Sequence, residues 1–200
     1  LDIYEYIVFV LVFFLFTVTA LLITPFVRLY TRGIVDTEYN QPLFGFLLVL
    51  SEALYLVKLP HLNLAYSANK FKEITVPAYI EATLNIVISV ALVKKLGLIG
   101  VTIGTIVGMT YRMVFHVYYT SKIVPGRVQR IFYRKLFLFA VGAGAGFALC
   151  YKLLPLQNVT VGSWIVHAIF YCVVIGSILL AISVLFFQNE MKFFAKYIKR

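Results

Sequence analysis

The chain has 200 residues, of which 62% are hydrophobic and 13% are charged. Soluble proteins contain roughly 45–50% apolar and about 25% charged residues, so this composition excludes a soluble globular, disordered or disulfide-rich protein. A net charge of +10 is typical of a membrane protein whose basic cytoplasmic surface faces anionic lipid, and we expect no nucleic-acid partner. The sequence therefore predicts an integral membrane protein.

Six stretches are long and apolar enough to cross a hydrocarbon core of about 30 Å, which takes about 20 residues. The first covers residues 6–24, and Pro25 is expected to end it. The others cover residues 43–68, 75–93, 98–120, 136–154 and 164–187. No stretch alternates with a period of two residues, which argues against a transmembrane barrel. We therefore predict an all-α, polytopic membrane protein with six transmembrane helices.

The distribution of lysine and arginine predicts the orientation of these spans. Of the 18 residues, eleven fall on the side that carries both termini, five on the opposite side, and two within spans. Because basic loops stay in the cytoplasm, both termini are expected to be cytoplasmic. The chain starts at Leu1, and the acidic Asp2 and Glu5 do not fit the basic leader of a signal peptide. We therefore expect the chain to begin within a larger protein.

Four ionisable side chains lie within the predicted spans: Glu52, Lys58, Glu81 and Arg112. Each costs at least about 2.5 kcal/mol near the bilayer centre, so their presence needs a reason. From a rise of about 1.5 Å per residue, Lys58, Glu81 and Arg112 should share one layer, roughly 20 Å below the outer ends of their helices. Glu52 should lie near the midplane.

Helical spacing indicates which of these residues face one another. Glu81 and Asn85 are four residues apart and share a face. On the following span one stripe repeats every four residues, namely Gly100, Gly104, Gly108, Arg112 and His116. Small residues on such a stripe let a neighbouring helix approach closely, so Arg112 is expected to point into the bundle. Its planar guanidinium could bind a diphosphate through two hydrogen bonds.

Two interpretations of these polar residues remain open. They could line a polar cavity and bind a charged substrate, because ionisable groups in membranes usually mark a pathway. The candidate substrate-binding residues are then Arg112, Lys58, Glu81, Asn85, Glu52 and His116. Alternatively, the two acids and two bases form neutralising pairs that only hold the helices in register.

Pro60 and the histidines provide weaker signals. Pro60 removes a backbone donor and should break the second span. In transporters such breaks often lie beside the substrate site or at a hinge, although a tolerated kink is an equal alternative. His61, His116 and His167 do not have the spacing of metal ligands, so we predict no metal site and no cofactor.

Three segments resemble a known family: residues 68–72 (ANKFK), 80–86 (IEATLNI) and 97–105 (GLIGVTIGT). They are similar to the carboxy-terminal half of bacterial polysaccharide-repeat flippases of the multidrug/oligosaccharidyl-lipid/polysaccharide exporter superfamily. The likeness covers most of residues 25–125. The last two spans match only in hydropathy and spacing.

The resemblance implies that residues 1–200 form the carboxy-terminal six-helix lobe of a MATE-like transporter with two lobes around a central cavity. Such a protein flips undecaprenyl-diphosphate-linked oligosaccharide repeat units across the bacterial cytoplasmic membrane by alternating access, for surface polysaccharide synthesis. Carried over residue by residue, Glu81, Asn85 and Arg112 match the family's polar positions. The partners implied are the lipid-linked diphosphate substrate, membrane lipid, a coupling proton or sodium ion, and the amino-terminal lobe that this chain lacks.

Three other functions are alternatives to a flippase. A multidrug or metabolite exporter of the same fold would have a more acidic and aromatic site, whereas Lys58 and Arg112 favour an anionic substrate. A membrane-embedded transferase that depends on metal would need clustered aspartates, but Asp2 and Asp36 are the only two and neither lies in a predicted span. A scaffold protein would gain nothing from four charges inside the membrane. We therefore expect a transporter and not an enzyme.

Overall fold

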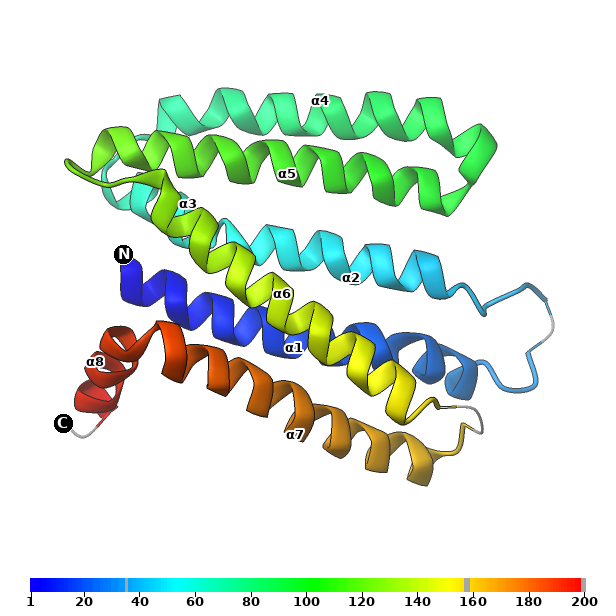
Figure 1. The fold of residues 1–200 in the computed structure, drawn as a ribbon. Helices are drawn as coiled ribbons and strands as arrows, with labels where there is room; N and C mark the ends of the chain where they lie inside the picture. Colours follow the sequence, from blue (N-terminus) through cyan, green and yellow to red (C-terminus); the bar gives the residue numbers. More distant parts are fainter. Residues whose placement is uncertain (35, 157–158, 199–200) are drawn as a thin grey trace.

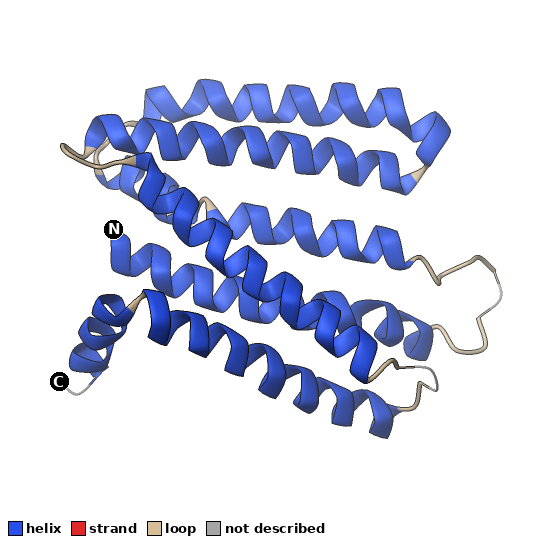
Figure 2. Cartoon of the chain, in the orientation of Figure 1, coloured by secondary structure: helices blue, strands red, loops and turns tan. Residues whose placement is uncertain are grey.

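The computed structural model describes residues 1–34, 36–156 and 159–198, which form eight helices and no strand (Figure 2). The membrane-spanning segments are α1 (Asp2–Tyr30), α2 (Pro42–Val57) continued by α3 (Leu59–Ser67), α4 (Phe71–Leu96), α5 (Leu98–Ile123), α6 (Gln129–Leu153) and α7 (Val161–Phe186). The short α8 (Gln188–Ile198) follows. Six spans long and apolar enough to cross a membrane confirm the predicted all-α, polytopic fold. Lys199 and Arg200, which contribute to the predicted charge bias, lie outside the described residues.

Both termini lie at the same end of the bundle, together with α3, α8 and the α5–α6 loop (Figure 1). Helix α1 is central and packs against α2, α6 and α7. Helix α5 packs between α2 and α4, so α4 lies at the edge of the bundle. Phe9, Phe132, Phe139 and Phe187 are fully buried at the end that carries the termini. The apolar core is therefore centred on the first half of α1.

Two predicted span boundaries are wrong for identifiable reasons. Helix α1 continues through Pro25 to Tyr30. A proline inside a helix removes one backbone donor, but the helix can continue past it as a tolerated kink. Helix α6 begins at Gln129, seven residues before the predicted start at residue 136. Its first two turns contain Arg130 and Arg134, which lower the local hydropathy, so a hydropathy pattern places the start of the span too late.

The predicted break in the second span is confirmed and falls at Lys58, between α2 and α3. Pro60 is the second residue of α3 and has no N–H to donate. The backbone N–H groups of His61 and Leu62 both donate to the carbonyl oxygen of Lys58, at 3.1 Å each. The break therefore places Lys58 at the junction of α2 and α3, outside both helices.

The glycine stripe of α5 brings that helix into close contact with α4, as predicted. Gly97 turns the chain between the two helices with a positive φ of 57°. A Cβ added at Gly104 would lie 2.4 Å from the Ser89 hydroxyl oxygen and 2.8 Å from the Asn85 backbone oxygen. Any side chain at this position would therefore push the helices apart.

Gly104→Ala should destabilise the folded protein by about 1–3 kcal/mol, because the added methyl group overpacks the contact between α4 and α5. Gly144→Ala is the matched control, since a Cβ at Gly144 meets no atom within 4 Å. This control should be neutral or slightly stabilising, because alanine has the higher helix propensity. Thermal unfolding of the purified variants measures both effects, and equal midpoints would contradict the close packing described.

Candidate functional site

The break at Lys58 places its side chain against α4 and α5. Lys58 Nζ lies 3.2 Å from Glu81 Oε1, and the Arg112 guanidinium donates to Glu81 Oε2. Lys58 is fully buried and Glu81 is 8% exposed. The structure therefore confirms that these residues share one layer, and it shows that Glu81 pairs with both cations at once. We call this group the Lys58–Glu81–Arg112 triad.

The glycine stripe explains how Arg112 reaches Glu81. At Gly108, one turn before Arg112, an added Cβ would lie 2.9 Å from the Glu81 backbone oxygen. The backbones of α4 and α5 are therefore close enough for the Arg112 side chain to meet the carboxylate directly. A bulky residue at position 108 would separate the pair.

Further groups surround the triad. Lys58 Nζ lies 3.3 Å from Met109 Sδ and 4.6 Å from the centre of the Tyr55 ring, a cation–π contact. Arg112 Nε donates to His116 Nε2 at 3.3 Å. His116 is fully buried, and its Nδ1 has no hydrogen-bond partner in the described part of the chain. With both basic residues protonated, the triad carries a formal charge of +1.

One edge of the triad is open. The Arg112 side chain is 17% exposed, and Tyr55 is 40% exposed on α2. Glu52, one turn before Tyr55, is exposed and forms no ion pair with any described residue. An unpaired carboxylate is costly against hydrocarbon. The surface with Glu52 and Tyr55, here called the polar edge, is therefore suited to water or another protein segment and poorly suited to lipid.

The remaining predicted site residues lie outside the triad. Asn85 Oδ1 accepts a hydrogen bond from Ser89 on its own helix at 3.0 Å, and one from Thr105 at 3.4 Å that links α4 to α5. Pro60 is buried at the start of α3, and its role as a hinge stays a prediction. The structure thus brings together Lys58, Glu81, Arg112 and His116, whereas Asn85 serves a neighbouring helix contact.

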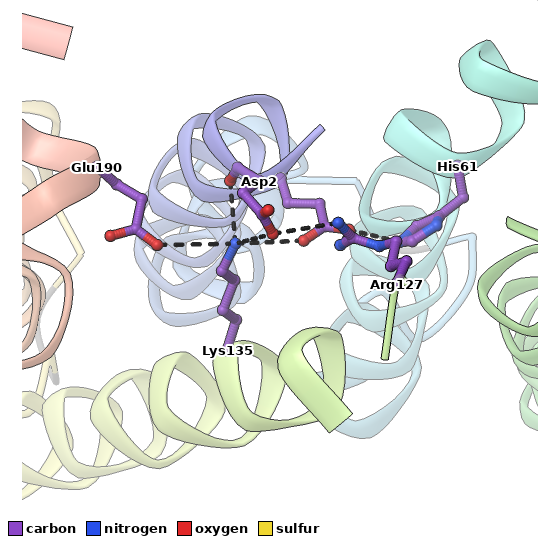
Figure 3. Close-up of polar contacts among 6 residues, drawn as sticks. Asp2, His61, Arg127, Lys135 and Glu190 are labelled. Carbon is purple, nitrogen blue, oxygen red and sulfur yellow. Dashed lines mark hydrogen bonds and ion pairs between the residues drawn. The ribbon is translucent and has the colours of Figure 1, made fainter. Parts of the chain in front are cut away.

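A second ionic group, which the sequence analysis missed, lies at the end of the bundle that carries the termini (Figure 3). We call it the terminal cluster; its members are Asp2, Glu5, His61, Arg127, Lys135 and Glu190. Glu5 is at its centre: Oε1 lies 3.0 Å from His61 Nε2, Oε2 lies 3.3 Å from Lys135 Nζ, and the Arg127 guanidinium donates to Oε1. The Glu5 side chain is fully buried.

Lys135 extends this cluster to both ends of the chain. Its Nζ donates to the Asp2 carbonyl oxygen at 3.0 Å and to Asp2 Oδ1 at 3.1 Å, and it lies 3.9 Å from Glu190 Oε1. Arg127 Nη1 lies 3.2 Å from Asp2 Oδ1. The cluster therefore joins α1, α3, the α5–α6 loop, α6 and α8.

The terminal cluster corrects one expectation. The predicted basic surface at the end with the termini includes Arg127 and Lys135, but their side chains are only 7% and 1% exposed and so do not face lipid. Their partners on α1 are more than 120 residues away in sequence, so no local spacing could reveal the contact. The one available signal was Glu5, a carboxylate at the start of a strongly apolar helix.

Comparison with protein-family models, with curated proteins and with solved structures finds no match to this chain. The two ionic groups and the open polar edge are therefore the basis for assigning a function.

Glu5→Gln should destabilise the protein by about 3–5 kcal/mol, because it leaves two buried cations without their shared carboxylate. The same change at Glu73, which pairs with Lys70 at 3.5 Å on the exposed surface, should have little effect, since exposed ion pairs contribute little. Thermal or denaturant unfolding in detergent compares the two variants. If Glu5→Gln were as mild as Glu73→Gln, the terminal cluster would not contribute to stability.

Proposed function

We propose that this chain is one lobe of a MATE-like flippase that moves undecaprenyl-diphosphate-linked oligosaccharide repeat units across the bacterial cytoplasmic membrane by alternating access, with both termini in the cytoplasm. The observation that carries the proposal is a positively charged triad within the membrane-spanning helices, whose arginine is 17% exposed and whose lysine contacts Tyr55 of the polar edge. A proton or sodium gradient would supply the driving force. The resemblance of residues 25–125 to such flippases supports the same assignment.

The charge of the triad favours an anionic substrate. One carboxylate serves two cations, so the formal charge is +1 and an additional anion would complete the pairing. Arg112 is the cation with an exposed edge, and a guanidinium can bind a phosphate group through two parallel hydrogen bonds. A substrate diphosphate would compete with Glu81 for this edge, and Lys58 would hold Glu81 in place as Arg112 shifts its partner.

The polar edge supports a second lobe or a water-filled cavity on this side of the bundle. Glu52 and Tyr55 are exposed one turn apart on α2, at a depth where hydrocarbon would otherwise be the solvent. The sugars of a lipid-linked oligosaccharide need such a hydrated route, while its lipid tail can stay in the bilayer. An exporter of cationic drugs would be expected to carry an excess of acidic groups around its cavity, whereas Lys58, Glu81 and Arg112 together carry a positive charge.

A purely structural clamp is the competing function, and one observation favours it: Lys58 and Glu81 are buried and paired with each other. In that case the ion pairs would hold α2, α4 and α5 in register, and either cation would suffice as a partner. The two possibilities differ in whether Arg112 has a role that Lys58 cannot fill.

A pair of double variants separates these possibilities. Lys58→Met with Glu81→Gln leaves only Arg112 charged, and Arg112→Met with Glu81→Gln leaves only Lys58. We expect the first to keep measurable translocation of lipid-linked oligosaccharide and the second to lose it, because only arginine offers the paired donors. Flipping is measured with labelled substrate in vesicles, and protein abundance is measured in parallel.

The single variants sharpen this test. Arg112→Gln should abolish flipping without loss of protein, whereas Arg130→Gln, the same change at an exposed arginine, should not. Equal activity of the two double variants, at equal abundance, would favour the clamp. Full activity of Arg112→Gln would contradict the proposed function.

A further inference from the structure

A groove runs between α1, α2 and α6, separate from both ionic groups. Helix α1 packs against both α2 and α6, so it forms the floor of the groove and the other two helices form its walls. Figure 1 shows that α6 crosses the bundle diagonally and diverges from α2. The two walls meet through the rings of Phe46 and Phe147, whose centres are 5.9 Å apart. Two hollows, of about 300 Å³ and about 790 Å³, share Ala20 and these two rings as lining and so adjoin along the groove.

The smaller hollow is suited only to hydrocarbon. It is lined by apolar side chains of the three helices, with small residues such as Ala143 and Gly144 on α6. Thr17 is its one polar residue, and the Thr17 hydroxyl already donates to the Phe13 carbonyl oxygen at 2.5 Å. An occupant of this hollow therefore finds no free hydrogen-bonding side chain.

The larger hollow has a different chemistry. It contains Thr24, Arg28 and Asn40, and Arg28 is the one charged residue among its lining. Arg28 is exposed and forms no ion pair with any residue that the structure describes. Thr24 and Arg28 are four residues apart and so lie on one face of α1. This end of the groove therefore offers a single unpaired positive charge beside polar groups.

The length of the groove matches one leaflet of a bilayer. Phe16 lies at the middle of α1 (Asp2–Tyr30) and lines the smaller hollow. Arg28 lies twelve residues further along, roughly 18 Å at about 1.5 Å per residue. Half of a hydrocarbon core is about 15 Å. An acyl chain in the smaller hollow would therefore place its headgroup phosphate beside Arg28.

We propose that this groove is a binding site for an anionic phospholipid, with one acyl chain between α1, α2 and α6 and the phosphate on Arg28. The single charge of Arg28 matches one phosphodiester group. A prenyl diphosphate would bring more negative charge than this end of the groove can neutralise. The site lies in the leaflet opposite the termini and is independent of the proposed transport of oligosaccharide.

Native mass spectrometry of the purified protein, offered equal amounts of phosphatidylglycerol and phosphatidylcholine, tests the site. We expect retention of phosphatidylglycerol in preference to phosphatidylcholine. Arg28→Gln should weaken that preference about tenfold or more, because it removes a charge-assisted hydrogen bond. Arg32→Gln is the matched control, since Arg32 is exposed four residues further on and does not line the groove.

A second variant tests the acyl-chain pocket itself. Gly144→Leu adds a side chain that meets no atom at its Cβ within 4 Å but projects from the groove lining. It should reduce lipid retention of either headgroup, whereas Gly162→Leu, an equally unobstructed glycine on α7, should not. Circular dichroism shows whether Gly144→Leu folds. If it does not, the comparison of Arg28→Gln with Arg32→Gln still tests the proposal.

Three outcomes would overturn the proposal. One is the absence of any headgroup preference in the unaltered protein. Another is equal behaviour of Arg28→Gln and Arg32→Gln. The third is displacement of the retained lipid by farnesyl diphosphate but not by added phosphatidylglycerol, which would assign the groove to a prenyl diphosphate.

Discussion

The cost of a charge in hydrocarbon is the constraint on which this fold depends. Lys58, Glu5 and Lys135 have fully or almost fully buried side chains, and each has an ionic partner within 3.3 Å. Every such pair joins different helices, so satisfying the charges also fixes how the helices are placed. The terminal cluster connects both ends of the chain, and the triad connects α2, α4 and α5. Removing one partner would leave an uncompensated buried charge, which costs more than the pair itself contributes.

Short-range features of the sequence create these long-range contacts. The proline after Lys58 ends α2 and gives the lysine its own position, and the glycines of α5 let α4 approach until Glu81 meets Arg112. The ionic groups lie in the middle of the bundle and at the end with the termini. Towards the opposite end, α2 and α6 diverge and leave a groove in place of ion pairs. The helices are therefore joined by more ionic contacts at the end with the termini than at the opposite end.

The sequence predicted what depends on composition and helical period. The six spans, the break at Pro60, the close contact along Gly104 and the shared layer of Lys58, Glu81 and Arg112 all follow from hydropathy, proline chemistry and the 3.6-residue repeat. The terminal cluster did not, because Glu5 meets Lys135 only after five spans have packed. Hydropathy also misplaced the start of α6, whose first turns are basic yet partly buried. The groove depends on how α6 diverges from α2, which no local pattern encodes.

The triad contains two cations and one carboxylate, and this imbalance bears most directly on function. A structural clamp between two helices needs one acid and one base, and a second cation adds a desolvation cost without a second carboxylate to offset it. Glu52 makes the charges within the spans sum to zero, yet it is exposed on α2 and is not in contact with either cation. Glu52 therefore does not complete the triad by an ion pair, and the Arg112 side chain stays 17% exposed. A guanidinium that is partly unpaired inside a membrane is better suited to binding an anion transiently than to clamping the helices together permanently.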